Sequence, residues 1–248
     1  GQAIQPLRLK GGLLMEFHLG LSARVTKDVD ALFRGELASF ESALDAAIAE
    51  PWGPFTLQRT TIEEIAGARR LVKPRRFDLK LLIRGAVWRR IKIEVSFPEG
   101  RIAEGAEPVP APNAGFFGIT TPDHLAGIAM AYQVAQKLHA CTDLDEPPAF
   151  INDRVRDVVD LLLIRDRFYP ALPPSSVRAA CLDVFEARAA EARAVDLPTR
   201  RWPPRLVVPN DEWKRAYPAL AESVAISLTL EQAVAELGDW VEAIEQAG

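Results

Sequence analysis

The chain has 248 residues, enough for one large domain or two small ones. Apolar residues make up 48% and charged residues 26%, a mixture typical of a globular protein with a hydrophobic core, which excludes a disordered or fibrous chain. The formal charge of −4 argues against a uniformly basic surface, although 30 Lys and Arg residues leave room for local basic patches.

Cysteine content and hydropathy indicate the compartment. Cys141 and Cys181 are too few for a disulfide framework and form no C-x-x-C or Cys/His cluster, as expected in a reducing environment. No apolar run approaches the roughly 20 residues that a membrane-spanning helix needs, and residues 1–10 lack the apolar segment of a signal peptide. We therefore expect a cytoplasmic protein with no membrane association.

Helices and a strand alternate at the start of the chain. Gly11 and Gly12, followed by apolar residues at helical spacing, predict a turn leading into a helix. Apolar and polar residues alternate over 25–33, which predicts a half-buried strand. Asp28 and Asp30 share one face of that strand, because successive side chains of a strand point to opposite faces. A helix is predicted next, over residues 37–49.

Three further strands are predicted, over residues 55–61, 76–84 and 87–97. The last two are separated by Gly85-Ala86 and predict a hairpin. Glu94 alternates with the apolar residues of the third strand, so its side chain is expected on the opposite face, toward solvent or a cleft.

The second half of the sequence is predicted to be helical. Residues 99–118 are rich in Pro and Gly, which predicts a loop and a domain boundary. Thr121-Pro122-Asp123 has the composition of a helix N-terminus, and this helix is expected to run to about Ala140. Further helices are predicted over residues 152–167, 173–194 and 229–244, and Thr229 with Gln232 predicts a capping box at the start of the last one. The fold class is therefore α+β, with a small sheet-containing lobe over residues 1–118 and a helical lobe over residues 119–248.

The D-x-D pair is the first candidate for chemistry. Alternate strand positions place Asp28 and Asp30 about 6–7 Å apart at the backbone, close enough to hold one divalent cation such as Mg²⁺. Gly11 and Gly12 at a helix start would let a phosphate approach the backbone. Either feature by itself is common on exposed strands and turns, so a solvated surface is the alternative.

Two separated blocks of sequence resemble the AbiEii/MenT-like nucleotidyltransferase toxins. The first block is Lys-Gly-Gly at residues 10–12, then Arg24 and T-x-D-x-D at residues 26–30. The second block is A-x-K-L-H-A at residues 135–140 and R-x-R-D-V-V-D-L at residues 154–161, similar to the lysine helix and the R-D-x-x-D-L helix of that family. The resemblance implies an N-terminal lobe like that of DNA polymerase β and a C-terminal helical lobe that completes the active cleft.

The resemblance also implies roles for individual residues. Catalysis is assigned to Asp28, Asp30, Glu94, Lys137 and Asp157, of which Asp28, Asp30 and Glu94 would hold Mg²⁺. Many relatives have Asp where this chain has Glu94. Nucleotide binding is assigned to Lys10, Gly11, Gly12, Arg24, Thr26 and Asp160. Lys137 would contact the triphosphate; the alternative is a lysine at the surface.

Basic residues gather in and near the predicted hairpin. Together with Trp88 they are the kind of groups that bind phosphate backbones and stack on bases, although a charge run is often only a solvated face. The candidate RNA-binding residues are Arg75, Arg76, Arg89, Arg90 and Lys92, with Arg69 beside them.

The function that the resemblance implies is that of the toxin in a type IV-like toxin–antitoxin pair. Such an enzyme would transfer nucleotides from a nucleoside triphosphate to the 3′ acceptor end of tRNA, which would block aminoacylation and translation. A cognate antitoxin protein is an implied partner. Two alternatives stay open: transfer to a protein hydroxyl, or a non-catalytic interaction protein with the same fold.

Overall fold

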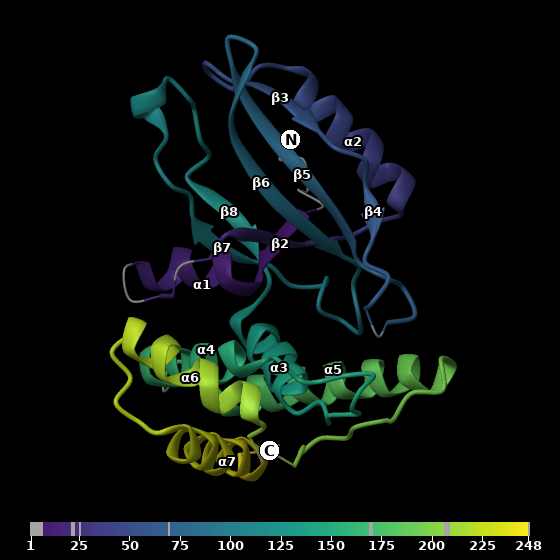
Figure 1. Cartoon of the computed structure of the whole chain (residues 1–248), viewed down its shortest axis with the longest axis vertical. Coiled ribbons are helices and arrows are strands. Elements are labelled where there is room, and N and C mark those ends of the chain that lie inside the picture. The colour runs from purple at the N-terminus through teal and green to yellow at the C-terminus, as the bar shows by residue number, and fades with distance from the viewer. Residues whose placement is uncertain are drawn as a thin grey trace. The chain divides into compact units, whose positions relative to one another are not determined.

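The computed structural model of the chain consists of two compact units (Figure 1). The first unit contains Gly1–Gly20, Val25–Pro98 and Ala103–Ile128, and the second contains Leu21–Arg24, Glu99–Ile102 and Ala129–Gly248. The structure describes residues 7–20, 23–24, 26–68, 70–168, 171–205 and 209–247. Val25, at the start of a predicted strand, and Arg69, in the predicted basic cluster, lie outside the described residues.

The first unit is built on one mixed sheet, which has eight strands within the described residues. Its strands are β1 (Leu7–Lys10), β2 (Asp28–Phe33), β3 (Thr56–Arg59), β4 (Glu63–Glu64), β5 (Arg75–Ile83), β6 (Ala86–Ser96), β7 (Glu107–Pro110) and β8 (His124–Gly127). The order is β3-β5-β6-β2-β1-β8-β7, and β4 pairs with β5. β2 lies in the interior of this order, antiparallel to β1 and parallel to β6. The α+β fold class is confirmed.

Two helices and the sheet enclose the apolar core of the first unit. The predicted helices are confirmed as α1 (Gly11–Leu19) and α2 (Leu37–Ala49). Phe40 of α2 packs on the sheet against Phe33 and Phe77, with ring centroids 5.1 and 6.0 Å away. These buried rings and Val95 occupy the face opposite to Asp28 and Asp30, because they stand at the alternate strand positions.

The predicted hairpin is confirmed as β5 and β6, with a shifted turn. The turn residues are Arg84 and Gly85, whose φ angles are 51° and 80°, and not Gly85-Ala86. Two central residues with positive φ are typical of the tight turns whose twist matches that of antiparallel strands. The register also shifts between Leu81 and Leu82, because Leu81 pairs with Arg89 while Leu82 pairs with Val87.

Two predictions around residues 99–127 were wrong. The predicted loop contains strand β7 and a short 3₁₀ helix, Gly115–Phe117. The proline-containing β7 lies at the end of the strand order, where a missing N–H is tolerated. The predicted helix start at Thr121-Pro122-Asp123 is followed by strand β8 instead. Gly127 allows that strand to pack closely, since a Cβ there would lie 2.7 Å from Leu14 Cδ1.

The second unit is helical in its described part. Its helices are α3 (Met130–Cys141), α4 (Val155–Phe168), α5 (Pro174–Ala194), α6 (Asp211–Ser223) and α7 (Leu230–Gln246). Thr229 and Gln232 form the predicted capping box of α7. Helix α6 was not predicted from the sequence; Pro218, a residue that usually interrupts helices, lies inside it. None of the described helices is long and apolar enough to cross a membrane.

Candidate active site

Strand β2 and its two neighbours carry the candidate metal-binding face of the first unit. Asp30 is the cross-strand partner of Lys10 on β1 and of Glu94 on β6. Asp28, two residues before Asp30, pairs in register with Lys92. Paired residues of adjacent strands share a face, so the predicted set of three carboxylates lies on one side of the sheet.

Gly11 makes the tightest contact with this face. Its φ angle is +65°, and a Cβ built on it would lie 2.1 Å from Asp30 Oδ2. Any side chain would therefore displace the Asp30 carboxylate, in addition to the strain of a left-handed backbone. Gly12 is buried behind it, in the first turn of α1. The glycine pair thus seats the start of α1 directly against the carboxylate of Asp30.

The segment before β2 is held by α1. The Thr26 amide donates to Glu16 Oε1 at 3.3 Å, and the Thr26 hydroxyl lies 3.5 Å from the carbonyl oxygen of Asp28. Thr26 was predicted to bind nucleotide; in this structure its hydroxyl is directed to the backbone that leads into the D-x-D strand. Glu16 was not identified from the sequence, because a carboxylate ten residues from its partner leaves no periodic signal.

Carboxylates accompany most of the predicted RNA-binding residues. Arg76 donates to Glu94 Oε1 at 2.7 and 2.9 Å, and Lys92 Nζ lies 3.5 Å from Asp28 Oδ1. The Arg75 pair with Glu64 measures 2.5 Å, and the Arg90 pair with Asp78 measures 3.9 Å. Of the five predicted residues, Arg89 is the one for which the described structure contains no such partner.

Asp28 and Asp30 are the oxygen donors of this face that suit Mg²⁺. Among the described residues, no group of three or more His, Cys, Asp or Glu side chains is arranged to hold a metal ion. Asp28 and Asp30 together offer two oxygen-bearing side chains on one face, and Mg²⁺ in proteins is commonly held by one or two carboxylates plus water and substrate phosphate oxygens. The residue types of the pair fit such an ion. Asp28 Oδ1 lies 3.5 Å from Lys92 Nζ, and Glu94 Oε1 accepts a closer hydrogen bond from Arg76, at 2.9 Å.

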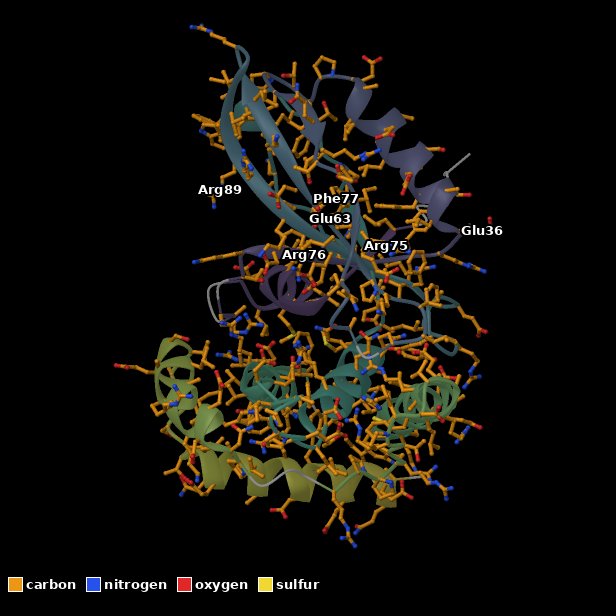
Figure 2. All side chains as sticks on the ribbon, turned by 45° about the vertical axis from the view of Figure 1, so that its right-hand side comes forward. Glu36, Glu63, Arg75, Arg76, Phe77 and Arg89 are labelled. Carbon is orange, nitrogen blue, oxygen red and sulfur yellow. The ribbon has the colours of Figure 1, made fainter. Side chains whose placement is uncertain are left out.

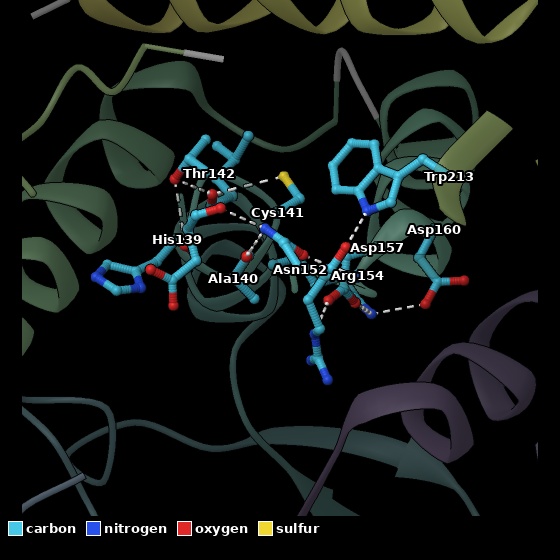
Figure 3. Close-up of polar contacts among 12 residues, drawn as sticks. His139, Ala140, Cys141, Thr142, Asn152, Arg154, Asp157, Asp160 and Trp213 are labelled. Atoms are coloured by element: carbon cyan, nitrogen blue, oxygen red, sulfur yellow. Dashed lines mark hydrogen bonds and ion pairs between the residues drawn. The ribbon is translucent and has the colours of Figure 1, made fainter. Parts of the chain in front are cut away.

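The second unit contains a buried ionic cluster on α3 and α4 (Figure 3). Lys137 Nζ donates to Asp157 Oδ1 at 2.8 Å and to Asp160 Oδ2 at 2.6 Å. The three side chains are 7%, 6% and 1% exposed, so the alternative of a surface lysine is excluded. An ammonium group has three hydrogen atoms, and two of them are used here, which leaves at most one for a phosphate oxygen.

Two arginines complete the cluster. Arg154 Nε donates to Asp157 Oδ2 at 2.8 Å, and Arg24 donates from Nε and Nη2 to the two oxygens of Asp160 at 3.1 and 3.2 Å. Arg24 and Asp160, both predicted to bind nucleotide, are thus paired with each other. Asp157 accepts hydrogen bonds from both Lys137 and Arg154 and so holds the two cations together.

Electrostatics keep this cluster charged at neutral pH. Burial by itself would raise the pKa of Asp157, but Lys137 and Arg154 outweigh it and hold the pKa at about 2, below the ordinary 3.8. Burial by itself would lower the pKa of Lys137, yet Asp157 and Asp160 hold it above its ordinary value. Lys137 and Asp157 therefore stay charged at neutral pH, each beside partners that the protein supplies.

The histidine and the cysteines of the second unit have structural positions. His139 Nδ1 lies 3.0 Å from both Arg188 Nη1 and Arg200 Nη2, and the ring packs edge-on against Phe185. Cys141 and Cys181 are buried, and burial raises the pKa of Cys141 to about 12. A thiolate at either position would be costly, so neither cysteine is placed as a nucleophile.

Comparison with solved structures identifies the class of fold. MenT4, a nucleotidyltransferase toxin of Mycobacterium tuberculosis H37Rv, is similar to this chain with a TM-score of 0.55 and 17% sequence identity, over 99% of this chain and 86% of that one. The chain thus has the fold of a nucleotidyltransferase toxin. No curated protein sequence matches it.

The family follows from the sequence itself. The family model described as "Nucleotidyl transferase AbiEii toxin, Type IV TA system" matches residues 2–240. The chain therefore belongs to the AbiEii family of nucleotidyltransferase toxins, and the resemblance noted in residues 10–30 and 135–161 is confirmed.

Proposed function

We propose that this chain is the toxin of a type IV toxin–antitoxin pair and that it transfers nucleotides from a nucleoside triphosphate to the 3′ acceptor end of tRNA in the presence of Mg²⁺. The contact between Gly11 and Asp30 is the main structural support. At this contact the start of α1, where Gly11 has no Cβ, meets the carboxylate of Asp30, and Asp30 lies on the same face of the sheet as Asp28. A nucleotidyltransferase needs such a combination, because it must hold a triphosphate and a divalent cation side by side.

The chemistry requires little covalent work from the protein. The acceptor hydroxyl forms a bond to the α-phosphorus, the bond to pyrophosphate breaks, and the hydroxyl proton passes to a carboxylate, for which Glu94 is the candidate. Mg²⁺ bound at Asp28 and Asp30 would neutralise charge on the phosphate oxygens and lower the pKa of the hydroxyl. The amides at the start of α1, with Lys10 in the adjacent strand, bind and orient the phosphates.

The ionic cluster of the second unit has a structural role in this proposal. Lys137 ties α3 to α4 through Asp157 and Asp160. Arg24 and Arg154 complete the charge pairing of the two carboxylates.

The test is incubation of the protein with each labelled nucleoside triphosphate, Mg²⁺ and total RNA. We expect the wild type to label RNA of tRNA size and Asp28→Asn to reduce the labelling at least about 100-fold, as for loss of a group that stabilises transition-state charge. Asp78→Asn is the matched control, because Asp78 pairs with the same Lys92 and lies on the same face of the sheet. That variant should label RNA as the wild type does.

The outcomes separate the alternatives. Label that depends on Asp28 but appears in protein would indicate transfer to a protein hydroxyl. If wild type and Asp28→Asn arrest growth equally when expressed in cells, and neither labels RNA or protein, the chain acts without catalysis and the proposal is wrong. Neutralisation by a co-expressed neighbouring gene product would identify the antitoxin.

A further inference from the structure

A β-bulge redirects Trp88 in the first unit. Leu81 pairs with Arg89 and Leu82 with Val87, so Trp88 has no residue opposite it on β5. An extra residue of this kind bends a strand and changes the direction of its side chain. The Trp88 ring stacks on Phe55 with centroids 5.1 Å apart, while 57% of the residue stays exposed.

Further exposed rings surround this point. Phe55 belongs to a buried cluster with Leu81 and Ile119. Trp52 exchanges two backbone hydrogen bonds with Phe55, at 2.8 and 3.1 Å. A Cβ on the intervening Gly53 would lie 2.6 Å from Ile119 Cγ1 and 3.2 Å from the Phe117 carbonyl oxygen. The turn at Trp52 and the 3₁₀ helix that carries the Phe116 and Phe117 rings therefore adjoin each other.

Four exposed aromatic residues thus lie around the buried Phe55 cluster, and we call them the aromatic surface. Its members are Trp52, Trp88, Phe116 and Phe117, with exposed fractions from 45% to 95%. Large exposed aromatic residues that gather in one place on a soluble domain mark interaction sites more often than chance. The Trp88 ring stacks on the buried Phe55, so little conformational entropy of that ring would be lost on binding.

The charges beside the aromatic surface indicate its occupant. Arg89 is the cross-strand partner of Leu81 in the cluster below, and Arg84 forms the adjoining hairpin turn. Neither arginine has an acidic partner in the described part of the chain, unlike Arg75, Arg76 and Lys92. Figure 2 labels Arg89 on β6, apart from the paired Arg75 and Arg76. Exposed rings flanked by unpaired guanidinium groups match the bases and phosphates of a single strand.

We propose that the aromatic surface, with Arg84 and Arg89, binds single-stranded RNA by base stacking and phosphate contacts. This inference rests on the proposed function, because it supposes an RNA acceptor. It adds Trp52, Phe116 and Phe117 to the candidate RNA-binding residues Trp88 and Arg89 that the sequence indicated. Recognition is expected to tolerate different sequences, because every base offers a face for stacking.

The test measures RNA binding separately from catalysis. The probe is a fluorescent single-stranded RNA of about 12 nucleotides, within the size range of single-strand sites, whose 3′ end copies that of tRNA; a blunt RNA hairpin is the comparison. We expect Trp88→Ala and Phe116→Ala each to weaken binding of the single strand by about 5- to 150-fold, the range for one stacked base. Arg89→Ala should reduce the slope of log affinity against log salt by about 0.7.

Matched controls come from the second unit. Leu182→Ala removes an exposed apolar side chain of α5, and Arg193→Ala removes an exposed arginine of the same helix. Both variants should bind the single strand as the wild type does. Phe116 is 95% exposed, so its replacement does not threaten folding and keeps the test decisive.

Failure of this inference and failure of the proposed function give different results. If the wild type labels RNA but Phe116→Ala and Trp88→Ala bind the probe normally, the aromatic surface is not an RNA site and a protein partner becomes its occupant. If the probe binds and the variants weaken it while no nucleotide transfer occurs, the surface is supported and the enzyme assignment fails. Equal binding of the hairpin and the single strand would also overturn the stacking proposal.

Discussion

Replacing Lys137 by methionine removes a buried positive charge and leaves an apolar chain of similar length. The carboxylates of Asp157 and Asp160 then lose their closest cationic partner, since Lys137 Nζ lies 2.8 Å from Asp157 Oδ1 and 2.6 Å from Asp160 Oδ2. Loss of one member of a buried ion pair costs about 3–5 kcal/mol. Asp157 keeps Arg154 and Asp160 keeps Arg24, so we expect the lower end, about 3 kcal/mol.

The same variant has a defined dependence on pH. The pKa of Asp157 is about 2 in the folded protein and near 3.8 when unfolded, which corresponds to about 2 kcal/mol of stability at neutral pH. Because the folded pKa is the lower one, this contribution is present above about pH 4 and is lost as the pH falls toward 2. Without Lys137 the burial of Asp157 is less well compensated and its pKa rises. The difference between wild type and variant should therefore shrink between pH 4 and 2.

The measurement is urea unfolding followed by helical circular dichroism, with thermal unfolding alongside. A loss of about 3 kcal/mol should lower the midpoint temperature by about 6–12 °C for a chain of this size. Lys214→Met is the matched control, since Lys214 is 56% exposed and its contact with Asp211 is 3.5 Å, and it should change stability by less than about 0.5 kcal/mol. If Lys137→Met is as stable as this control, the buried ionic cluster does not hold α3 to α4.

Two further predictions concern a glycine and the thiols. Gly11→Ala and Gly20→Ala both place a side chain at positive φ. A Cβ at residue 20 meets nothing within 4 Å, whereas a Cβ at residue 11 meets Asp30. We expect RNA labelling to fall at least about 10-fold only in Gly11→Ala, because the reaction rate depends on the position of the catalytic groups. Equal loss in both variants would show that backbone strain is responsible. Cys141, with a pKa near 12, and the buried Cys181 should react with a thiol reagent at pH 8 only after unfolding, so rapid modification of the native protein would contradict their burial.

Local patterns in the sequence predicted much of the secondary structure. The apolar periodicity of residues 37–49, the capping residues Thr229 and Gln232 and the alternation around Asp28 and Asp30 each depend on neighbours a few residues away, and each was confirmed as helix, capping box or strand. The family resemblance also depended on short motifs of residue type and spacing, which a sequence contains in full.

The same local patterns did not show which distant residues contact each other. Strand β8 replaced a predicted helix start because pairing with β1 and β7 outweighed the local capping preference of Thr121-Pro122-Asp123. The basic residues of the hairpin were visible, but their carboxylate partners on neighbouring strands were not, so the sequence could not separate Arg89 from the paired cations.

Local sequence patterns were enough to predict the fold class, the helices with clear periodicity and the residue types of the candidate site. The burial of Lys137, the pairing of Arg24 with Asp160 and the stacking of Trp88 on Phe55 became visible only in the folded chain. The physical reason is the sequence distance between the residues involved. The strand period of two residues and the helix period of 3.6 residues depend on positions a few residues apart. Arg24 and Asp160 lie 136 residues apart and meet only when the chain has folded.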